Sequence, residues 1–166
     1  MESELLEQLY RRYHRELYLY LFSLCRSAAL AEDLVQETFL KALLALPDGH
    51  PNLRAWLYLV ARNLYFSHCR REKHRAAEEL PDSIPSQEEG PPEQLLAGEQ
   101  ARVLYRALSG LEVRRREVLL LQYFAGLSQR EIAGILHLTP EHVRVLAHRA
   151  RRELKQQLEA NGYDIP

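Results

Sequence analysis

Residues 126–158 read GLSQREIAGILHLTPEHVRVLAHRARRELKQQL and contain two helix starts in close succession. Ser128 and Glu131 have the spacing of a capping box, in which the hydroxyl accepts a hydrogen bond from a first-turn amide and the carboxylate reaches back to the serine amide. Thr139 and Pro140 give the second start, because threonine caps helices well and proline suits the first helical position. Two helices joined by about three residues predict a helix-turn-helix.

The second of these helices has an apolar face and a basic face. The apolar residues recur at intervals of three and four, so they form one stripe; they are Val143, Ala147, Ala150, Leu154 and Leu158. Arg144, His148, Arg151 and Lys155 form another stripe, with further arginines beside it. Such a helix suits the major groove of DNA, where arginine pairs with guanine or phosphate. An isolated helix of this kind would be interpreted as a solvated surface helix, but the capped helix just upstream favours DNA binding.

The rest of the chain also has helical periodicity, apart from one acidic stretch. The expected helices span residues 6–24, about 31–46, about 53–75, 92–108 and 114–125. Alternation of apolar and polar residues, which would indicate strands, is not seen in the sequence. The predicted fold class is therefore all-α.

The formal net charge is −1, from 22 Lys and Arg residues against 23 Asp and Glu residues, which by itself argues against a strongly basic nucleic-acid binder. The charge is unevenly distributed, with +2 in residues 1–75, −7 in residues 76–101 and +4 in residues 102–166. Residues 76–92 also contain four prolines and few large apolar residues, which is typical of a linker. We expect two small helical domains, 1–75 and 93–166, on either side of it.

The sequence gives no indication of a membrane span or of catalysis. The acidic N-terminal residues differ from a signal peptide, and Cys25 and Cys69 form neither a disulfide framework nor a metal-ligand pattern. Glycine-rich phosphate loops and Ser/His/Asp arrangements are also missing. We expect a cytoplasmic protein that is not an enzyme and has no cofactor, metal or small-molecule substrate.

Three blocks in this order resemble the extracytoplasmic-function (ECF) group of bacterial RNA polymerase sigma factors. They are AEDLVQETF at 31–39, WLYLVARN at 56–63, and GLSQREIA at 126–133 followed by residues 143–151. The helix-turn-helix alone is also typical of LuxR-type regulators, which bind duplex DNA without polymerase. That alternative leaves the first 75 residues unexplained. A sigma-like interaction module that no longer recognises promoters is a further alternative.

The resemblance implies a transcription initiation factor that binds core RNA polymerase and promoter DNA. It places core-polymerase contacts at Asp33, Gln36, Glu37 and Phe39. It places contacts with the promoter −10 element at Asn63, Ser67, Arg70, Arg71 and Lys73, and part of a base pocket in the loop 47–52. We expect Trp56, Tyr65 and Phe66 in the core and not as base-stacking platforms.

The resemblance further places contacts with the −35 element at Arg144, Val145, His148, Arg149 and Arg152. Two positions depart from the family pattern: Ser67 stands where the family usually has Asp or Asn, and Val145 where it usually has a polar residue. Valine can contact a thymine methyl but cannot donate a hydrogen bond. The family also implies an anti-sigma protein, often membrane-bound, that holds the factor inactive.

Overall fold

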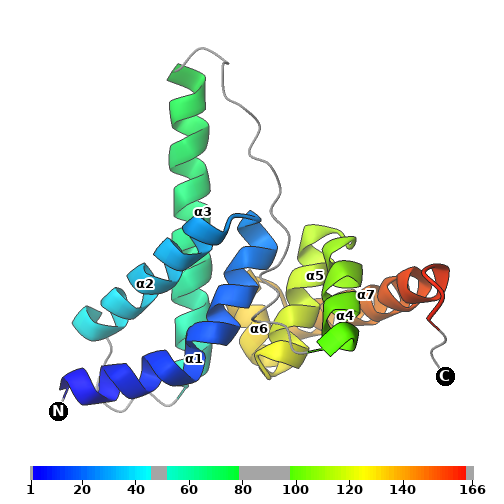
Figure 1. Ribbon diagram of the computed structural model, residues 1–166, viewed down its shortest axis with the longest axis horizontal. Coiled ribbons are helices and arrows are strands. Elements are labelled where there is room, and N and C mark those ends of the chain that lie inside the picture. The colour runs from blue at the N-terminus through cyan, green and yellow to red at the C-terminus, as the bar shows by residue number, and fades with distance from the viewer. Residues whose placement is uncertain (1, 46–51, 79–97, 164–166) are drawn as a thin grey trace. The chain divides into compact units, whose positions relative to one another are not determined.

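The computed structural model describes residues 2–45, 52–78 and 98–163, and every regular element within these ranges is a helix (Figure 1). The chain divides into two compact units, Met1–Gly90 and Pro91–Pro166. The expected all-α fold is confirmed. Most of the expected loop at 47–52 and most of the expected linker lie outside the described residues. Among the described helices, none combines the length and apolar character that crossing a membrane requires.

The N-terminal unit consists of three helices, α1 (Glu2–Cys25), α2 (Ala28–Ala45) and α3 (Leu53–Glu78). Arg26, with φ 57°, turns the chain between α1 and α2, and its amide donates to the Phe22 carbonyl at 2.9 Å. The Ser27 hydroxyl accepts from the Leu30 amide at 3.2 Å and so caps α2. This cap explains why α2 begins three residues before the position expected from periodicity.

Helix α3 is buried in its first half and exposed in its second. Asn52 caps its start, with Oδ1 accepting from the Ala55 amide at 3.2 Å. Its C-terminal part projects past α1 and α2 (Figure 1), and the helix reaches Glu78 because Ala76 and Ala77 are good helix formers. Residues 76–78, expected in the linker, are therefore helical. The projecting half buries little apolar surface and leaves its basic side chains available.

The core of the N-terminal unit lies where α1 meets α2 and α3. Leu17, Leu21, Phe22, Val35 and Leu57 are buried there. The Tyr58 ring meets the Tyr20 ring edge-on, with centroids 5.2 Å apart. Trp56, Tyr65 and Phe66 are only half-buried, so their expected core placement is corrected. Tyr65 and Phe66 lie nearer the point where α3 leaves its neighbours, whereas Trp56 lies in the first turn of α3, next to the buried Leu57 and Tyr58.

The C-terminal unit consists of α4 (Gly98–Ser109), α5 (Val113–Leu119), the π-helical turn η2 (Leu120–Phe124), α6 (Gln129–Leu136) and α7 (Pro140–Ala160). The helix expected over 114–125 thus ends in a wider turn, in which the Ala125 amide donates to the Leu120 carbonyl at 3.0 Å. This turn leaves the side chains of Tyr123 and Phe124 exposed. π-turns of this kind often occur at functional sites.

Helix α7 holds the C-terminal unit together by packing on α4, α5 and α6. Val143, Ala147 and Ala150 of its predicted apolar stripe are buried, whereas Leu154 and Leu158 are half-buried. Farther along, Gln157 Nε2 donates to the Gly110 carbonyl at 3.2 Å. A side chain at position 110 would come within 2.5 Å of Gln157, so glycine permits this close approach.

Candidate nucleic-acid interface

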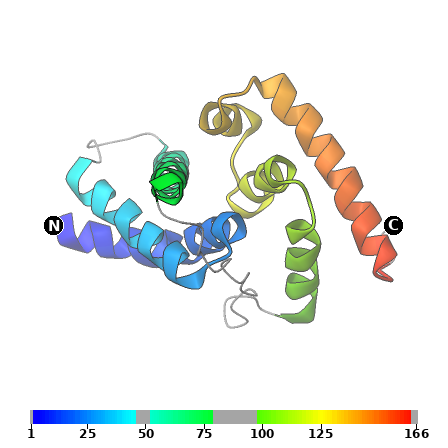
Figure 2. The same ribbon diagram turned by 90° about the horizontal axis from the view of Figure 1, so that it is seen from above.

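The helix-turn-helix forms as its two caps predict. The Ser128 hydroxyl accepts from the Glu131 amide at 3.1 Å, and the Glu131 carboxylate accepts from the Ser128 amide at 2.8 Å. The Thr139 hydroxyl accepts from the His142 amide at 3.1 Å. Between the helices His137 adopts a left-handed conformation, with φ 59°. Figure 2 shows the tight turn that results between α6 and the long α7.

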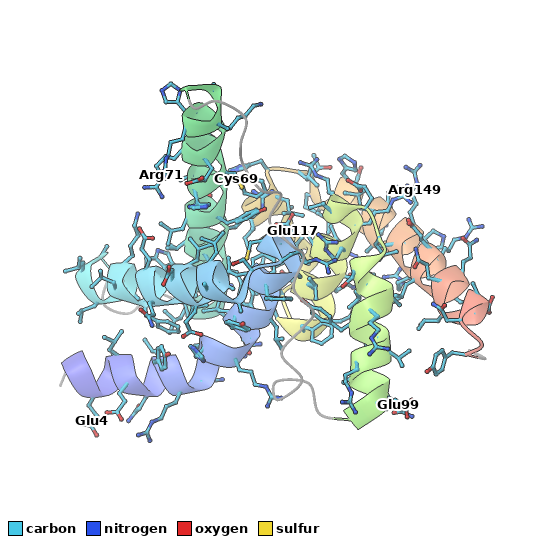
Figure 3. The ribbon with its side chains drawn as sticks, turned by 45° about the horizontal axis from the view of Figure 1, so that its top comes forward. Glu4, Cys69, Arg71, Glu99, Glu117 and Arg149 are labelled. Carbon is cyan, nitrogen blue, oxygen red and sulfur yellow. The ribbon has the colours of Figure 1, made fainter. Side chains whose placement is uncertain are left out.

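The five residues predicted to contact the −35 element all lie on the exposed side of α7. Arg144, His148, Arg149 and Arg152 are exposed, and Val145 is 41% exposed. Figure 3 shows Arg149 pointing away from the helices of its unit. The residues interspersed among them are buried against α5 and α6; these are Val143, Leu146, Ala147 and Ala150. The helix is therefore fixed along one side while its basic side faces outward.

Two other cations of the expected basic stripe have local partners. Arg151 Nη1 donates to the Tyr123 hydroxyl at 3.3 Å, which turns this guanidinium toward η2. Lys155 Nζ lies 4.0 Å from Glu159 Oε1, one turn farther along α7. The basic surface available to DNA is thus concentrated in the first half of α7.

The predicted −10 residues follow the projecting half of α3. Asn63, Arg70, Arg71 and Lys73 are exposed, and Ser67 is half-buried. Arg70 Nη2 donates to the Ser67 hydroxyl at 3.0 Å. The arrangement is a cationic helix surface with one polar side chain, Asn63, near the point where α3 leaves the core.

A groove of about 840 Å³ runs between α2 and this half of α3. It is lined by Glu37, Lys41, Leu64, Ser67, Arg70, Arg71, His74 and Arg75. Figure 3 shows Arg71 on the side of α3 along which α2 extends. The groove therefore brings together Ser67, Arg70 and Arg71 from the predicted −10 set and Glu37 from the predicted polymerase set. Asn63 and Lys73 do not line it.

Lys41 is a lining residue to which the sequence analysis assigned no role. It follows Glu37 by one turn of α2, so a helical projection places both on one side. The projection does not show that α3 supplies the opposite wall, because that depends on how the two helices cross. Lys41 could therefore be recognised only from the packed structure.

On its other side, α2 borders an apolar hollow of about 380 Å³ shared with α1. Its lining residues are Leu6, Glu7, Tyr10, Gln36, Phe39, Leu40 and Leu43. The Phe39 side chain is only 4% exposed and its ring centroid is 5.0 Å from that of Tyr10, so it forms the floor of the hollow. Asp33 and Gln36 are exposed on the ridge between the hollow and the groove.

Exposed leucines on α2 were not singled out in the sequence analysis. Leu40, Leu43 and Leu44 are 54%, 46% and 77% exposed. Periodicity could have identified them, since they lie off the buried stripe of α2. Clustered apolar side chains on a surface usually mark a protein contact.

A second apolar hollow, of about 330 Å³, lies in the C-terminal unit. It is lined by Leu104, Leu108, Leu119, Tyr123, Phe124, Arg151 and Leu154. Two of these residues belong to η2, whose wider turn is not encoded in an apolar pattern. This hollow was therefore also missed in the sequence analysis.

In the part of the chain that the structure describes, the groups with altered pKa values lie in the N-terminal unit. Tyr10 lines the hollow beside α2, where burial and Glu32 raise its pKa. Glu16 and Tyr58 lie deeper in the unit. Tyr58 donates a hydrogen bond to Glu16 Oε1 at 3.2 Å, and Arg54 Nε lies 3.8 Å from the same oxygen. Burial raises the pKa of Glu16, although Arg54 and Tyr58 oppose the rise. Burial and the neighbouring carboxylate raise the pKa of Tyr58 well above its ordinary value. Among the described residues, no group of three metal-ligating side chains is found.

Both units match families of known proteins. Residues 9–75 match the family described as Sigma-70 region 2, and residues 101–154 match Sigma-70, region 4. The chain is 35% identical over 158 residues to the RNA polymerase sigma factor YlaC of Bacillus subtilis, covering 92% of this chain and 91% of the relative. It is 30% identical to the ECF RNA polymerase sigma factor SigM of the same organism, covering 90% and 93% of the two chains.

Two solved structures are similar over nearly the whole chain. One is the sigma factor RpoE in complex with the anti-sigma factor NepR from Bartonella quintana, with a TM-score of 0.74, 26% identity and coverage of 92% of this chain and 96% of that one. The other is CnrH in complex with the cytosolic domain of CnrY, with a TM-score of 0.64, 26% identity and coverage of 96% and 91%.

Proposed function

The chain belongs to the extracytoplasmic-function group of RNA polymerase sigma factors, and we propose that its two units divide promoter recognition between them. As a sigma factor it is not an enzyme, and it directs RNA polymerase to promoters. We assign residues 1–75 to core-polymerase and −10 binding, the residues between the end of α3 at Glu78 and residue 92 to a linker, and residues 93–166 to −35 binding. The LuxR-type alternative fails because the first unit matches sigma region 2.

The observation that best supports the assignment is the basic side of α7. Arg144, His148, Arg149 and Arg152 are exposed beside Val145, while the opposite side of the helix is buried. The capped turn after α6 fixes the direction in which α7 leaves the unit. A rigid helix of this kind enters a major groove with its N-terminal residues nearest the bases. These five residues are our proposed −35 contacts.

We assign −10 contacts to Asn63, Ser67, Arg70, Arg71 and Lys73 on α3. Asn63 has an amide that can pair with a base edge, whereas the arginines and Lys73 suit phosphates. Ser67 accepts a hydrogen bond from Arg70, so we assign it the role of positioning that arginine.

We assign core-polymerase contacts to the exposed ridge of α2. Asp33, Gln36 and Glu37 supply polar contacts, and Phe39 supports the ridge from below. The exposed leucines beside them add the apolar area that protein interfaces require.

We also propose that an anti-sigma protein holds this factor inactive in the cytoplasm. One structurally similar sigma factor, RpoE, was solved in complex with the anti-sigma factor NepR, and the similar CnrH was solved with the cytosolic domain of CnrY. The apolar hollows beside α2 and η2 would suit apolar side chains of that partner. A membrane-bound partner is compatible with this arrangement if its binding segment lies on the cytoplasmic side.

Run-off transcription tests the proposed function. The full chain is combined with core polymerase on genomic fragments that include the region upstream of its own gene. We expect initiation from a defined promoter, and weaker initiation with the Arg149→Ala variant. If the chain does not bind core polymerase at low salt, the proposal is wrong.

A further inference from the structure

The groove between α2 and α3 has cations on both walls, although the α2 wall also carries the carboxylate of Glu37. Arg70, Arg71 and Arg75 come from α3, and Lys41 comes from α2. Glu37 is the one carboxylate among the lining residues, and His74 adds a side chain that carries further positive charge when protonated. The groove is therefore positively charged at neutral pH, although the α2 wall belongs to a helix whose proposed partner is a protein.

Lys41 is available to bind a ligand in this groove. Its side chain is exposed, and among the described residues it has no ion-pair or hydrogen-bond partner. Arg71, on the opposite wall, is also exposed and has no such partner in the described parts of the chain. Two unpaired cations on facing helices leave positive charge that an anion can neutralise.

The shape of the groove indicates an extended anion and not a small one. A volume of about 840 Å³ is much larger than one phosphate needs, and the lining residues follow α3 over about three turns, from Leu64 to Arg75. Several cations along an open groove are typical of proteins that track a nucleic-acid backbone. The same groove already contains Ser67, Arg70 and Arg71, to which we assign −10 contacts.

We propose that α2 is the second wall of the −10 DNA site and that Lys41 binds a phosphate of the promoter backbone. This inference rests on the proposed function, because it requires α3 to bind promoter DNA. Lys41 and Arg71 hold the backbone from opposite sides of the groove. Glu37, one turn before Lys41, repels phosphate and so marks where the DNA surface ends and the polymerase surface begins.

The test measures how holoenzyme binding to DNA depends on salt. Core polymerase is combined with the full chain, and two probes carry a promoter identified by run-off transcription, one fully duplex and one with mismatches that open the −10 element. Log K falls as log salt rises, and each lost phosphate contact makes this slope less steep by about 0.9 for a duplex and about 0.7 for a single strand. If wild type and Lys41→Ala bind equally at about 1 M salt, this change in slope means that Lys41→Ala should bind roughly fivefold to eightfold more weakly at 0.1 M.

The two probes show whether Lys41 contacts duplex or single-stranded backbone. The salt dependence of Lys41→Ala should be less steep than that of the wild type only on the probe that contains the contacted form. The Lys41→Arg variant keeps the charge and should retain nearly the wild-type slope. Arg11→Ala is the matched control, since Arg11 is an exposed cation of the same unit that pairs with Glu7 at 2.7 Å and does not line the groove. Its slope should equal that of the wild type.

The outcomes separate this inference from the proposed function. If the wild-type holoenzyme does not bind the promoter at all, the proposed function fails. If it binds and Lys41→Ala retains the wild-type slope on both probes, α2 is not a wall of the DNA site. If Lys41→Ala weakens binding to core polymerase in the absence of DNA, Lys41 belongs to the polymerase surface and the inference is wrong.

Discussion

The guanidinium of Arg70 donates a hydrogen bond to the hydroxyl of Ser67, 3.0 Å away and one turn earlier on α3. Both side chains line the groove between α2 and α3. Ser67 stands where the family usually has Asp or Asn. With a serine there, the side chain can position the arginine that contacts DNA.

This relationship predicts non-additive effects on −10 binding. Arg70→Ala should weaken binding by about 1–2 kcal/mol, and Ser67→Ala by less, because Arg70 retains its charge. If Ser67 acts through Arg70, the double variant should bind like Arg70→Ala alone. Holoenzyme affinity for a promoter with an opened −10 element measures all three. Additive losses would mean that Ser67 contacts DNA independently.

A second prediction concerns Glu16, whose pKa is raised mainly by burial. A raised carboxyl pKa means that the folded state favours the neutral form. This contribution to stability is present below the ordinary glutamate pKa of 4.5 and is lost as pH rises through the pKa of the folded state. Glu16→Gln should remove this pH dependence, and its amide oxygen can still accept from Tyr58.

Urea unfolding between pH 4 and pH 7, followed by the fluorescence of Trp56, measures this effect. Trp56 is the chain's one tryptophan and belongs to the same unit as Glu16. The free energy of unfolding of the wild type should fall relative to Glu16→Gln as pH rises. Glu7→Gln is the control, because Glu7 is exposed on the same helix. Equal pH dependence in wild type and Glu16→Gln would contradict the prediction.

Features that depend on a few neighbouring residues were predicted from the sequence. The capping box at Ser128 and the cap at Thr139 formed because each requires only residues three positions apart. The exposed basic side of α7 followed from its periodicity, whereas Val145 was singled out by the family resemblance. The cap at Ser27 is equally local, yet it was missed because the apolar stripe was used to place the start of α2.

Features that depend on packing could not be predicted in this way. Trp56 is half-buried although the buried Leu57 and Tyr58 follow it, because its exposure depends on how the start of α3 packs on its neighbours, which the sequence pattern does not specify. Lys41 faces a cationic wall only because α2 and α3 cross as they do. The π-turn at η2 exposes Tyr123 and Phe124 although the pattern predicts an ordinary α-helix end.

The caps around the helix-turn-helix predict losses of stability. Ser128→Ala and Thr139→Ala each remove an oxygen that accepts a first-turn amide, which should cost about 1 kcal/mol of unfolding free energy. Thermal or urea unfolding followed by circular dichroism measures this. Gln129→Ala is the control, since Gln129 is exposed in the same turn and has no capping role. If Gln129→Ala costs as much, the losses do not come from capping.

The basic side of α7 predicts which arginines bind the −35 element. Arg144→Ala and Arg149→Ala should each weaken binding by about 1–3 kcal/mol if they contact bases. Arg106→Ala should leave binding unchanged, because Arg106 is an exposed arginine of the same unit that lies on α4 and is not among the proposed contacts. Electrophoretic mobility shifts with holoenzyme on duplex promoter DNA measure these differences. Wild-type binding by both α7 variants would refute their assignment.

Val145 predicts a thymine in the −35 element. Its side chain is 41% exposed between Arg144 and the exposed His148, and it can contact bases only through apolar atoms. The thymine methyl is the apolar group that bases present in the major groove. Replacing that thymine with deoxyuridine removes the methyl alone, which should cost about 0.8 kcal/mol, or roughly fourfold in affinity.

Holoenzyme binding to promoter probes that carry one deoxyuridine each locates the contact. With the wild type, deoxyuridine at one probe position should weaken binding. With Val145→Ala, deoxyuridine at that position should have no effect, because the contact with the thymine methyl is already absent. Arg144→Ala should still distinguish thymine from deoxyuridine at that position, since it removes charge and leaves the valine in place. A wild-type loss that persists in Val145→Ala would mean that another side chain contacts the methyl. Equal binding to every probe would mean that α7 distinguishes bases through its polar residues alone.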